Sequence, residues 1–135
     1  MIHYTEDLTN ISVDNLSAQF FVGWLNAPSP ETHLKLLQGS YHVCLALDDD
    51  TVVGFITAIS DGVLTAFIPL LEITPAYQGQ GIGRELTRRM LASLDNLYSV
   101  DLLCDVELQA YYAKLGMVAV HGMAVRNYHN QAGTG

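Results

Sequence analysis

Residues 77–84 read Tyr-Gln-Gly-Gln-Gly-Ile-Gly-Arg and connect an extended apolar run to a segment with helical spacing. Glycine has no Cβ, so its backbone N–H can approach a ligand that any side chain would screen. Beyond the glycines, apolar residues recur at intervals of three or four, which indicates one face of an α-helix: Ile82, Leu86, Met90, Leu94 and Leu97. The stretch therefore predicts a strand, a loop that lies close to a bound group, and a helix N-terminus.

Positive charge is concentrated beside this loop. Arg84, Arg88 and Arg89 supply half of the six Lys and Arg residues in a chain of net charge -8. A helix N-terminus adds unpaired N–H groups and the positive end of the helix dipole. We therefore expect an anion to bind at the glycine loop.

Three known anion-binding motifs can be compared with the loop. A P-loop requires Lys and then Ser or Thr after its last glycine, whereas an Arg-Glu pair follows here. A dinucleotide fingerprint requires its third glycine three residues after the second, whereas these glycines are spaced by two. The pattern Gln78-x-x-Gly81-x-Gly83 resembles the pyrophosphate-binding motif of the GNAT family of N-acetyltransferases, Gln/Arg-x-x-Gly-x-Gly/Ala. The alternative is an ordinary strand–turn–helix connection with spare glycines.

A second segment resembles the same family. Residues 110–117 read Ala-Tyr-Tyr-Ala-Lys-Leu-Gly-Met and are similar to the family's penultimate helix, commonly Phe-Tyr-x-Lys-x-Gly-Phe. The apolar spacing indicates a short amphipathic helix: Leu108, Tyr111, Tyr112 and Leu115. Gly116 suits the left-handed position that follows such a helix. The resemblance covers residues 40–128 well and the first forty residues loosely.

The elements expected along the chain alternate in type. Strands are expected over residues 2–5, 41–47, 51–60, 63–74 and 99–104. Helices are expected over residues 13–21, 31–37, 82–97 and 108–115, followed by a hairpin that turns at His121-Gly122. Asp61-Gly62 predicts a tight turn between two strands. Pro69 cannot donate to a ladder, so a bulge or a departure from a neighbouring strand is expected around it.

These elements predict an α/β fold, a mixed sheet with helices on both faces, in a single domain over residues 1–135 with a frayed tail over 129–135. The resemblance implies a GNAT-like fold, with a central, mostly antiparallel twisted sheet. No apolar run reaches membrane-spanning length and no secretory leader opens the chain, so a cytoplasmic protein without a membrane partner is expected. The pI near 4.7 argues against nucleic acid as a partner.

Cysteine and histidine give no sign of a metal site. Cys44 and Cys104 fall in expected strands and are interpreted as buried, reduced thiols, not as a disulfide or a nucleophile. The five histidines show no metal-ligand spacing with one another or with the cysteines. No metal is therefore expected.

Acetyl transfer to an amine needs a base for the ammonium proton, a donor for the thioester oxygen and an acid for the departing thiolate. Tyr112 matches the family's tyrosine at the acid position, which leaves Tyr111 to pack; the alternative is that both tyrosines pack. Glu72 is the candidate base, because it lies in an apolar run on the strand that lines the cofactor in this family, where burial would raise its pKa. The alternatives are an exposed carboxylate or one paired with an arginine.

The resemblance implies acetyl-CoA as the acyl donor. The residues expected to hold it flank Glu72, form the glycine loop or end the following strand: Leu71, Ile73, Gln78, Gly79, Gln80, Gly81, Ile82, Gly83, Arg84 and Asp105. Asp105 stands where many relatives have Asn, so the alternative is that it caps the next helix through Leu108. Trp24 is a candidate for the wall of an acceptor pocket or for the core.

The function implied is transfer of an acetyl or acyl group from acetyl-CoA to a primary amine by direct attack in a ternary complex. The acceptor is expected to be a small molecule or a peptide; the acidic surface suits a cation without choosing among amines. The alternative is a non-catalytic module of the same fold that binds or senses acyl-CoA. Small enzymes of this family are often dimers, so the resemblance allows a homodimer without requiring one.

Overall fold

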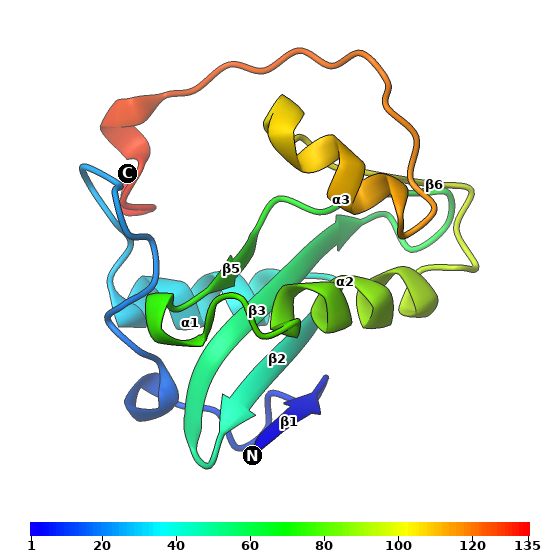
Figure 1. The fold of residues 1–135 in the computed structure, drawn as a ribbon. Helices are drawn as coiled ribbons and strands as arrows, with labels where there is room; N and C mark the ends of the chain where they lie inside the picture. The colour runs from blue at the N-terminus through cyan, green and yellow to red at the C-terminus, as the bar shows by residue number, and fades with distance from the viewer.

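A six-stranded sheet forms the centre of the structure, a computed structural model that describes residues 1–135 (Figure 1). The strands are β1 (Ile2–Thr5), β2 (His42–Asp48), β3 (Thr51–Ser60), β4 (Thr65–Phe67), β5 (Leu71–Ile73) and β6 (Ser99–Asp101). The α-helices are α1 (Pro30–Gly39), α2 (Ile82–Ser93) and α3 (Gln109–Ala113). Single 3-10 turns occupy Val13–Asn15, Pro75–Tyr77, Val106–Leu108 and Tyr128–Asn130. No helix has both the length and the apolar character needed to cross a membrane.

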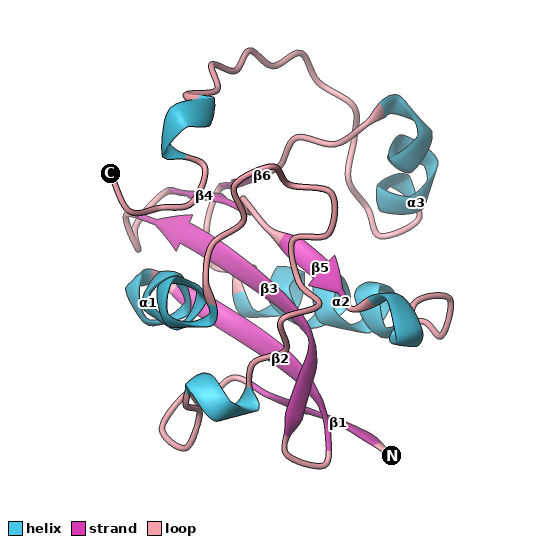
Figure 2. Cartoon of the chain, turned by 90° about the vertical axis from the view of Figure 1, so that its left-hand side faces the viewer, coloured by secondary structure: helices cyan, strands magenta, loops and turns pink.

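The strands follow the order β1-β2-β3-β4-β6, and β5 also pairs with β3. Every pair is antiparallel except β4 with β6, which run parallel. Figure 2 shows α1 and α2 on opposite sides of this sheet. The prediction of a mixed, mostly antiparallel sheet with helices on both faces is confirmed.

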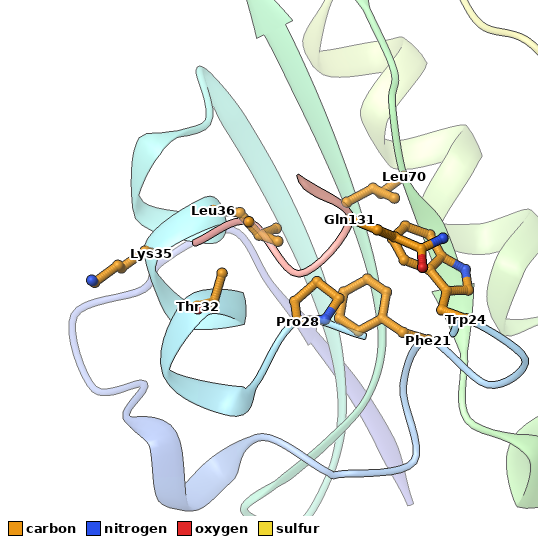
Figure 3. Close-up of a pocket in the computed structure, with 9 residues that line it drawn as sticks. Phe21, Trp24, Pro28, Thr32, Lys35, Leu36, Leu70 and Gln131 are labelled. Atoms are coloured by element: carbon orange, nitrogen blue, oxygen red, sulfur yellow. The ribbon is translucent and has the colours of Figure 1, made fainter. Parts of the chain in front are cut away.

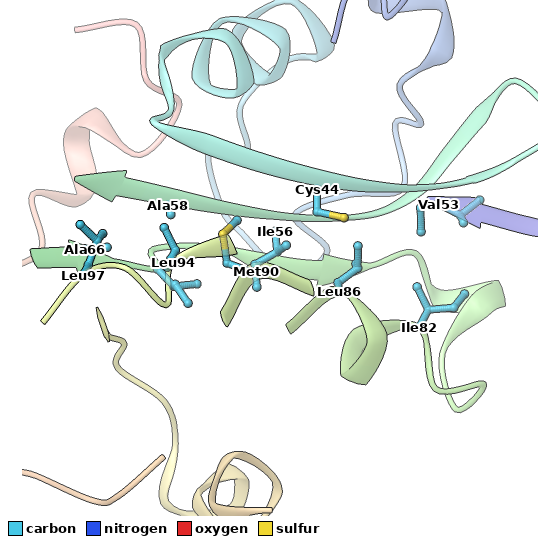
Figure 4. Close-up of a cluster of buried hydrophobic side chains, with 12 residues drawn as sticks. Cys44, Val53, Ile56, Ala58, Ala66, Ile82, Leu86, Met90, Leu94 and Leu97 are labelled. Atoms are coloured by element: carbon cyan, nitrogen blue, oxygen red, sulfur yellow. The ribbon is translucent and has the colours of Figure 1, made fainter. Parts of the chain in front are cut away.

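Each face of the sheet has its own hydrophobic cluster, because alternate side chains of a strand point to opposite faces. The cluster in Figure 4 joins α2 to the sheet and includes Cys44, Ile56, Ile82, Leu86, Met90 and Leu94. The opposite cluster joins α1 to the sheet and includes Phe20, Phe21, Leu37, Leu45, Val52 and Phe55. With both faces covered, β2 and β3 are buried almost throughout, and the first turn of α2 is fixed against β3.

The strand expected over residues 63–74 is divided into two. β4 pairs with the end of β3 and with β6, whereas β5 pairs with the middle of β3. Pro69 lies between them, and the adjacent Ile68 N–H donates to the carbonyl of Asp101 at 2.8 Å. Of the two expected ways to accommodate Pro69, a bulge or a departure from a neighbouring strand, the structure shows the departure. The turn at Asp61-Gly62 is also longer than expected, because the Asp61 carboxylate accepts the N–H groups of residues 63–65.

The expectation of a helix over residues 13–21 is wrong. Only Val13–Asn15 forms a 3-10 turn, capped by Ser12. The residues that follow are irregular, and Phe21 adopts a left-handed φ of 61°. The apolar residues there are spaced for burial against the sheet and not for a helix. Phe20 and Phe21 lie in the cluster on the α1 face and pack edge-on or tilted against His33 and Phe55. Tertiary packing has overridden a helical pattern.

The expectation of a final hairpin at His121-Gly122 is also wrong. Residues 118–127 form no strand, and none of them has the positive φ that a tight two-residue hairpin turn requires. The strand expected over 99–104 is shortened to β6. The tail, expected to be frayed, contains a 3-10 turn, and the Gln131 side chain accepts the Asn26 N–H at 2.9 Å.

Candidate active site

The glycine loop presents backbone donors to open space. Gly79 and Gly81 have φ of 78° and 83°, and a Cβ added at either would meet no atom within 4 Å. Gly81 is the residue that precedes α2, and no side chain caps that helix. None of the backbone N–H groups of residues 79–84 donates a hydrogen bond within the chain. A row of free donors at a helix N-terminus is an anion site by its physical chemistry.

Of the three arginines beside the loop, only Arg84 has no acidic partner. Arg88 donates twice to the Glu85 carboxylate, at 2.9 and 2.6 Å, and Arg89 donates to it at 3.0 Å. The Arg89 guanidinium also lies 4.5 Å from the centre of the Tyr4 ring. These bonds lower the pKa of Glu85 to about 2. Of the expected cluster of three cations, only the exposed Arg84 guanidinium therefore has no acidic partner.

The two glutamines of the motif hold the loop in shape. The Gln78 amide donates to the carbonyl of Ile73 at 3.0 Å, and its own N–H reaches the carbonyl of Pro75 at 3.4 Å. The Gln80 amide makes a longer bond, 3.5 Å, to the carbonyl of Ala76. Gln78 thus holds the loop in its conformation, and the backbone N–H groups without a partner begin at Gly79.

One edge of β5 is open. The N–H of Thr74 donates to Val53 and the N–H of Thr57 donates to the carbonyl of Leu70, so the even-numbered residues of this segment bond to β3. In an antiparallel ladder the residues between them face the other way. The backbone groups of Leu71 and Ile73 therefore point to the open edge, and only the Ile73 carbonyl there has a partner, the Gln78 amide.

A cavity of about 590 Å³ lies between the segments that diverge after β4 and β6. It brings together Leu71, Glu72, Asp105 and Tyr112 from the predicted site, whereas the glycine loop lies outside it at the far end of β5. The remaining wall is mostly apolar: Trp24, Ile68, Pro69, Leu70, Leu102, Leu103, Cys104, Leu108 and Arg126. The sequence motifs gave no signal for Arg126, which comes from the irregular segment near the C-terminus.

Glu72 lies half-buried in this cavity. Burial raises the pKa of its carboxyl above the ordinary value, and a hydrogen bond from the Phe21 N–H opposes that rise. The bond joins Phe21 N to Glu72 Oε1 at 2.8 Å. Glu72 therefore forms no ion pair with an arginine, although Arg126 lines the same cavity, and it is not exposed on a strand face; its carboxylate holds the left-handed residue of the loop before α1.

The two tyrosines of α3 are in different places. Tyr112 is half-buried and lines the cavity, where burial is the main cause of a raised pKa. Tyr111 lies outside the cavity: its hydroxyl is 3.5 Å from the position that a Cβ on Gly83 would take, and burial raises its pKa above the ordinary value. The rings meet edge-on with centroids 4.9 Å apart.

Asp105 and Cys104 end the segment that follows β6. The Asp105 carbonyl accepts the Leu108 N–H at 2.9 Å, but its carboxylate forms no cap, so the alternative role of Asp105 as a side-chain cap is wrong. Both cysteines are free thiols. Cys44 is buried, and burial raises its pKa to about 11, whereas Cys104 is only partly buried and lines the cavity. The expectation of two buried thiols holds for Cys44 alone.

A second cavity of about 400 Å³ adjoins the first and shares Trp24 and Leu70 with it (Figure 3). Its other lining residues come from the loop before α1, from α1 and from the tail: Phe21, Pro28, Thr32, Lys35, Leu36, Gln131 and Gly133. Trp24, 38% exposed, therefore stands between the two cavities and is not a core residue.

Comparisons with known proteins point to one family. A model described as the acetyltransferase (GNAT) family matches residues 10–117. A crystal structure of a proposed acetyltransferase from Deinococcus radiodurans R1 is 41% identical, with a TM-score of 0.92, and the match covers 97% of this chain and 92% of that one. A GNAT family acetyltransferase from Brucella melitensis, solved in complex with acetyl-CoA, shares the fold at 24% identity and a TM-score of 0.66, over 88% of this chain and 84% of that one.

Among curated relatives, an uncharacterized N-acetyltransferase of Porphyra purpurea is 28% identical over 102 residues, which are 72% of this chain. The match spans 59% of that relative's length.

Proposed function

This chain belongs to the GNAT family of acetyltransferases, and from that premise we propose that it transfers an acetyl group from acetyl-CoA to a primary amine, which attacks the thioester directly. The observation that carries the proposal is the cavity that both Glu72 and Tyr112 line, at one end of β5, whose other end leads into a row of free N–H donors. We propose that the pyrophosphate lies at these donors and the thioester in the cavity, with the open edge of β5 between them.

The residues fit acetyl-CoA. The N–H groups of residues 79–84 and the Arg84 guanidinium would hold the phosphates, since both are free and both favour an anion. The open edge of β5 would hold the pantetheine arm through the backbone of Leu71 and Ile73. The structure of the Brucella melitensis relative in complex with acetyl-CoA supports this choice of ligand.

When bound, acetyl-CoA supplies an activated acyl group and a thiol leaving group. Tyr112 is proposed to donate a proton or a hydrogen bond to the departing sulfur, because its hydroxyl stays protonated when burial raises its pKa. The N–H of Leu71, facing the open edge, is a candidate donor for the thioester oxygen. Glu72, or a water that it positions, is proposed to accept the proton of the ammonium.

A second function, binding or sensing of acyl-CoA without turnover, is favoured by one observation. The Glu72 carboxylate already accepts a backbone N–H, so its role could be confined to holding Phe21 in place. The variant Glu72→Gln separates the two roles, because the Gln carbonyl oxygen can still accept that N–H but cannot accept a proton. A base role predicts a fall in kcat of about 10²–10⁴-fold, whereas a purely structural role predicts activity close to wild type.

The acceptor is proposed to be a small-molecule or peptide amine that reaches the thioester from the side of Trp24. The net charge of -8 favours a cationic acceptor over nucleic acid or an anionic membrane. We also propose a cytoplasmic location. The test is a screen of polyamines, amino sugars, lysine peptides and N-terminal peptides with acetyl-CoA, which reads the release of free thiol. Release that requires both the acceptor and the acetyl donor supports transfer. Tight acetyl-CoA binding without release by any acceptor would favour the sensing function.

A further inference from the structure

Arg126 is a cation of the larger cavity to which acetyl transfer itself assigns no role. It lies in the irregular segment after α3 and lines the same cavity as Glu72 and Tyr112. The chain has only six Lys and Arg residues against 14 Asp and Glu residues, yet Arg126 forms no ion pair. A guanidinium presents a planar set of donors that matches a carboxylate with two parallel bonds. The cavity wall therefore offers donors for a carboxylate beside the proposed base.

The acidic residues of this cavity do not neutralise that cation. Glu72 accepts the Phe21 N–H at 2.8 Å, and neither Glu72 nor Asp105 forms an ion pair with Arg126. The carboxylate of a ligand would therefore meet Arg126 without breaking an ion pair of the folded chain. One cavity can thus bind an amine at Glu72 and a carboxylate at Arg126.

The smaller cavity is apolar and contains no acidic residue. Its volume of about 400 Å³ is within the usual range of small-molecule sites, about 300–1,000 Å³. Figure 3 shows the side chains of Phe21, Trp24 and Leu70 near that of Gln131, whereas the nitrogen of Lys35 points away from them. This cavity therefore suits an uncharged, apolar group. Trp24 and Leu70 line both cavities, so a ligand in one can extend into the other.

We infer that the acceptor is an α-amino acid with an aliphatic or aromatic side chain, held by its carboxylate at Arg126 and by its side chain in the smaller cavity. The inference rests on the proposed function and names the substrate class of the same site. An α-amino acid carries its ammonium and its carboxylate on one carbon, so both charged groups can lie in the cavity that Glu72 and Arg126 share. The side chain then extends past Trp24 into the apolar cavity.

Other amines fit these two cavities less well. A polyamine or an amino sugar brings no carboxylate to Arg126 and places polar groups against an apolar wall, where they lose hydrogen bonds to water. A peptide N-terminus has a neutral amide where the free amino acid has its carboxylate. The net charge of -8 acts on the approach of a ligand, whereas the side chains that line the cavities select among the ligands that arrive.

Acetyl transfer to an amino acid balances without a further reactant. The bond between the amino nitrogen and the acetyl carbon forms, and the bond between that carbon and sulfur breaks. The ammonium loses two protons, of which one is balanced by the proton that the sulfur gains and the other passes through the base to solvent. The products are an N-acetyl amino acid and CoA.

The first test is titration calorimetry on the wild-type protein saturated with CoA, which has no acetyl group to transfer. L-Leucinamide differs from L-leucine in a neutral amide that replaces the carboxylate, so leucine is expected to bind about ten- to hundredfold more tightly. Glycine keeps the carboxylate but lacks the side chain, and it is expected to bind at least about tenfold more weakly than leucine. The inference is overturned if leucine does not bind, or if leucinamide, glycine or spermidine binds as tightly as leucine.

The second test assigns the carboxylate to Arg126. Arg126→Gln removes the guanidinium and is expected to lower the affinity for leucine about ten- to hundredfold, so that leucine and leucinamide bind alike. The matched control is Lys114→Gln, which removes one positive charge from an exposed residue that lines neither cavity and should keep the wild-type difference. An Arg126→Gln variant that still prefers leucine, or an equal loss in both variants, contradicts the assignment.

The release of free thiol from acetyl-CoA separates this inference from the proposed function. Leucine that binds as expected but releases no thiol contradicts acetyl transfer and leaves the recognition of the amino acid standing. Thiol release with spermidine, together with no binding of leucine, contradicts the inference and leaves acetyl transfer standing. Release with leucine that falls in Arg126→Gln and persists in Lys114→Gln supports both.

Discussion

Arg84→Ala should weaken acetyl-CoA binding, whereas Arg88→Ala should leave it nearly unchanged. Both side chains are exposed and lie in the first turns of α2, so each substitution removes one positive charge from the same region. Arg88 is held by two bonds to Glu85, while Arg84 has no acidic partner. A hydrogen bond to a charged group contributes about 1.5–3 kcal/mol, which corresponds to about a ten- to hundredfold change in Kd for Arg84.

The Arg88 variant calibrates the effect of charge alone. Its pair with Glu85 is exposed and screened by solvent, so its loss should change stability little, and Glu85 keeps its bond to Arg89. Titration calorimetry with acetyl-CoA gives the two Kd values, and acetyl-pantetheine, which lacks the nucleotide phosphates, is the matched ligand. Equal losses in the two variants, or an equal loss of acetyl-CoA and acetyl-pantetheine binding in Arg84→Ala, would refute a direct phosphate contact by Arg84.

Three further predictions concern protonation and reactivity. If Glu72 is the base, kcat/KM should rise with pH through a pKa above the ordinary 4.5, and that inflection should be missing from the pH profile of Glu72→Gln. Burial lowers the pKa of His33 from 6.5 to about 4. Between these pH values the unfolded chain binds a proton at His33 that the native state does not bind, so stability falls as the pH drops below 6.5. Denaturant titrations should show that His33→Leu removes about 2 kcal/mol of the loss between pH 8 and pH 5; an unchanged loss would contradict this. Cys104, on the cavity wall, should be alkylated faster than Cys44 and be protected by acetyl-CoA, as peptide mass mapping can check; equal rates would oppose a cavity that is accessible in solution.

The parts of the fold that follow from local pattern were predictable. Continuous apolar runs gave β2 and β3, and the period of the apolar residues from Ile82 gave α2. Pro69 marked the point where the third long strand divides, because a residue without an N–H cannot continue a ladder. These features depend on residues that are close in the sequence, so the local pattern alone predicts them.

The wrong predictions concern segments whose conformation is set by contacts with residues that are distant in the sequence. Phe20 and Phe21 carry a helical spacing, but their rings pack around His33 and Phe55, and the backbone follows the packing. His121-Gly122 was expected to form a hairpin turn, but residues 118–127 pair with no strand in the structure and none of them has a positive φ. Within the site, the motifs located the free donors of the glycine loop, whereas the pairing of Arg88 with Glu85 required the rotamers of α2.

The turnover of Tyr112→Phe tests acetyl transfer by this chain most directly. The substitution removes only the hydroxyl, so the ring still packs edge-on against Tyr111 and lines the cavity. If the hydroxyl stabilises the departing sulfur, the interaction grows only as charge develops, and its loss appears in kcat and scarcely in the Kd of acetyl-CoA. With the acceptor found in the screen, we predict a fall in kcat of about 10²–10⁴-fold with near-normal acetyl-CoA binding. Wild-type turnover by Tyr112→Phe would contradict the assigned role of this tyrosine.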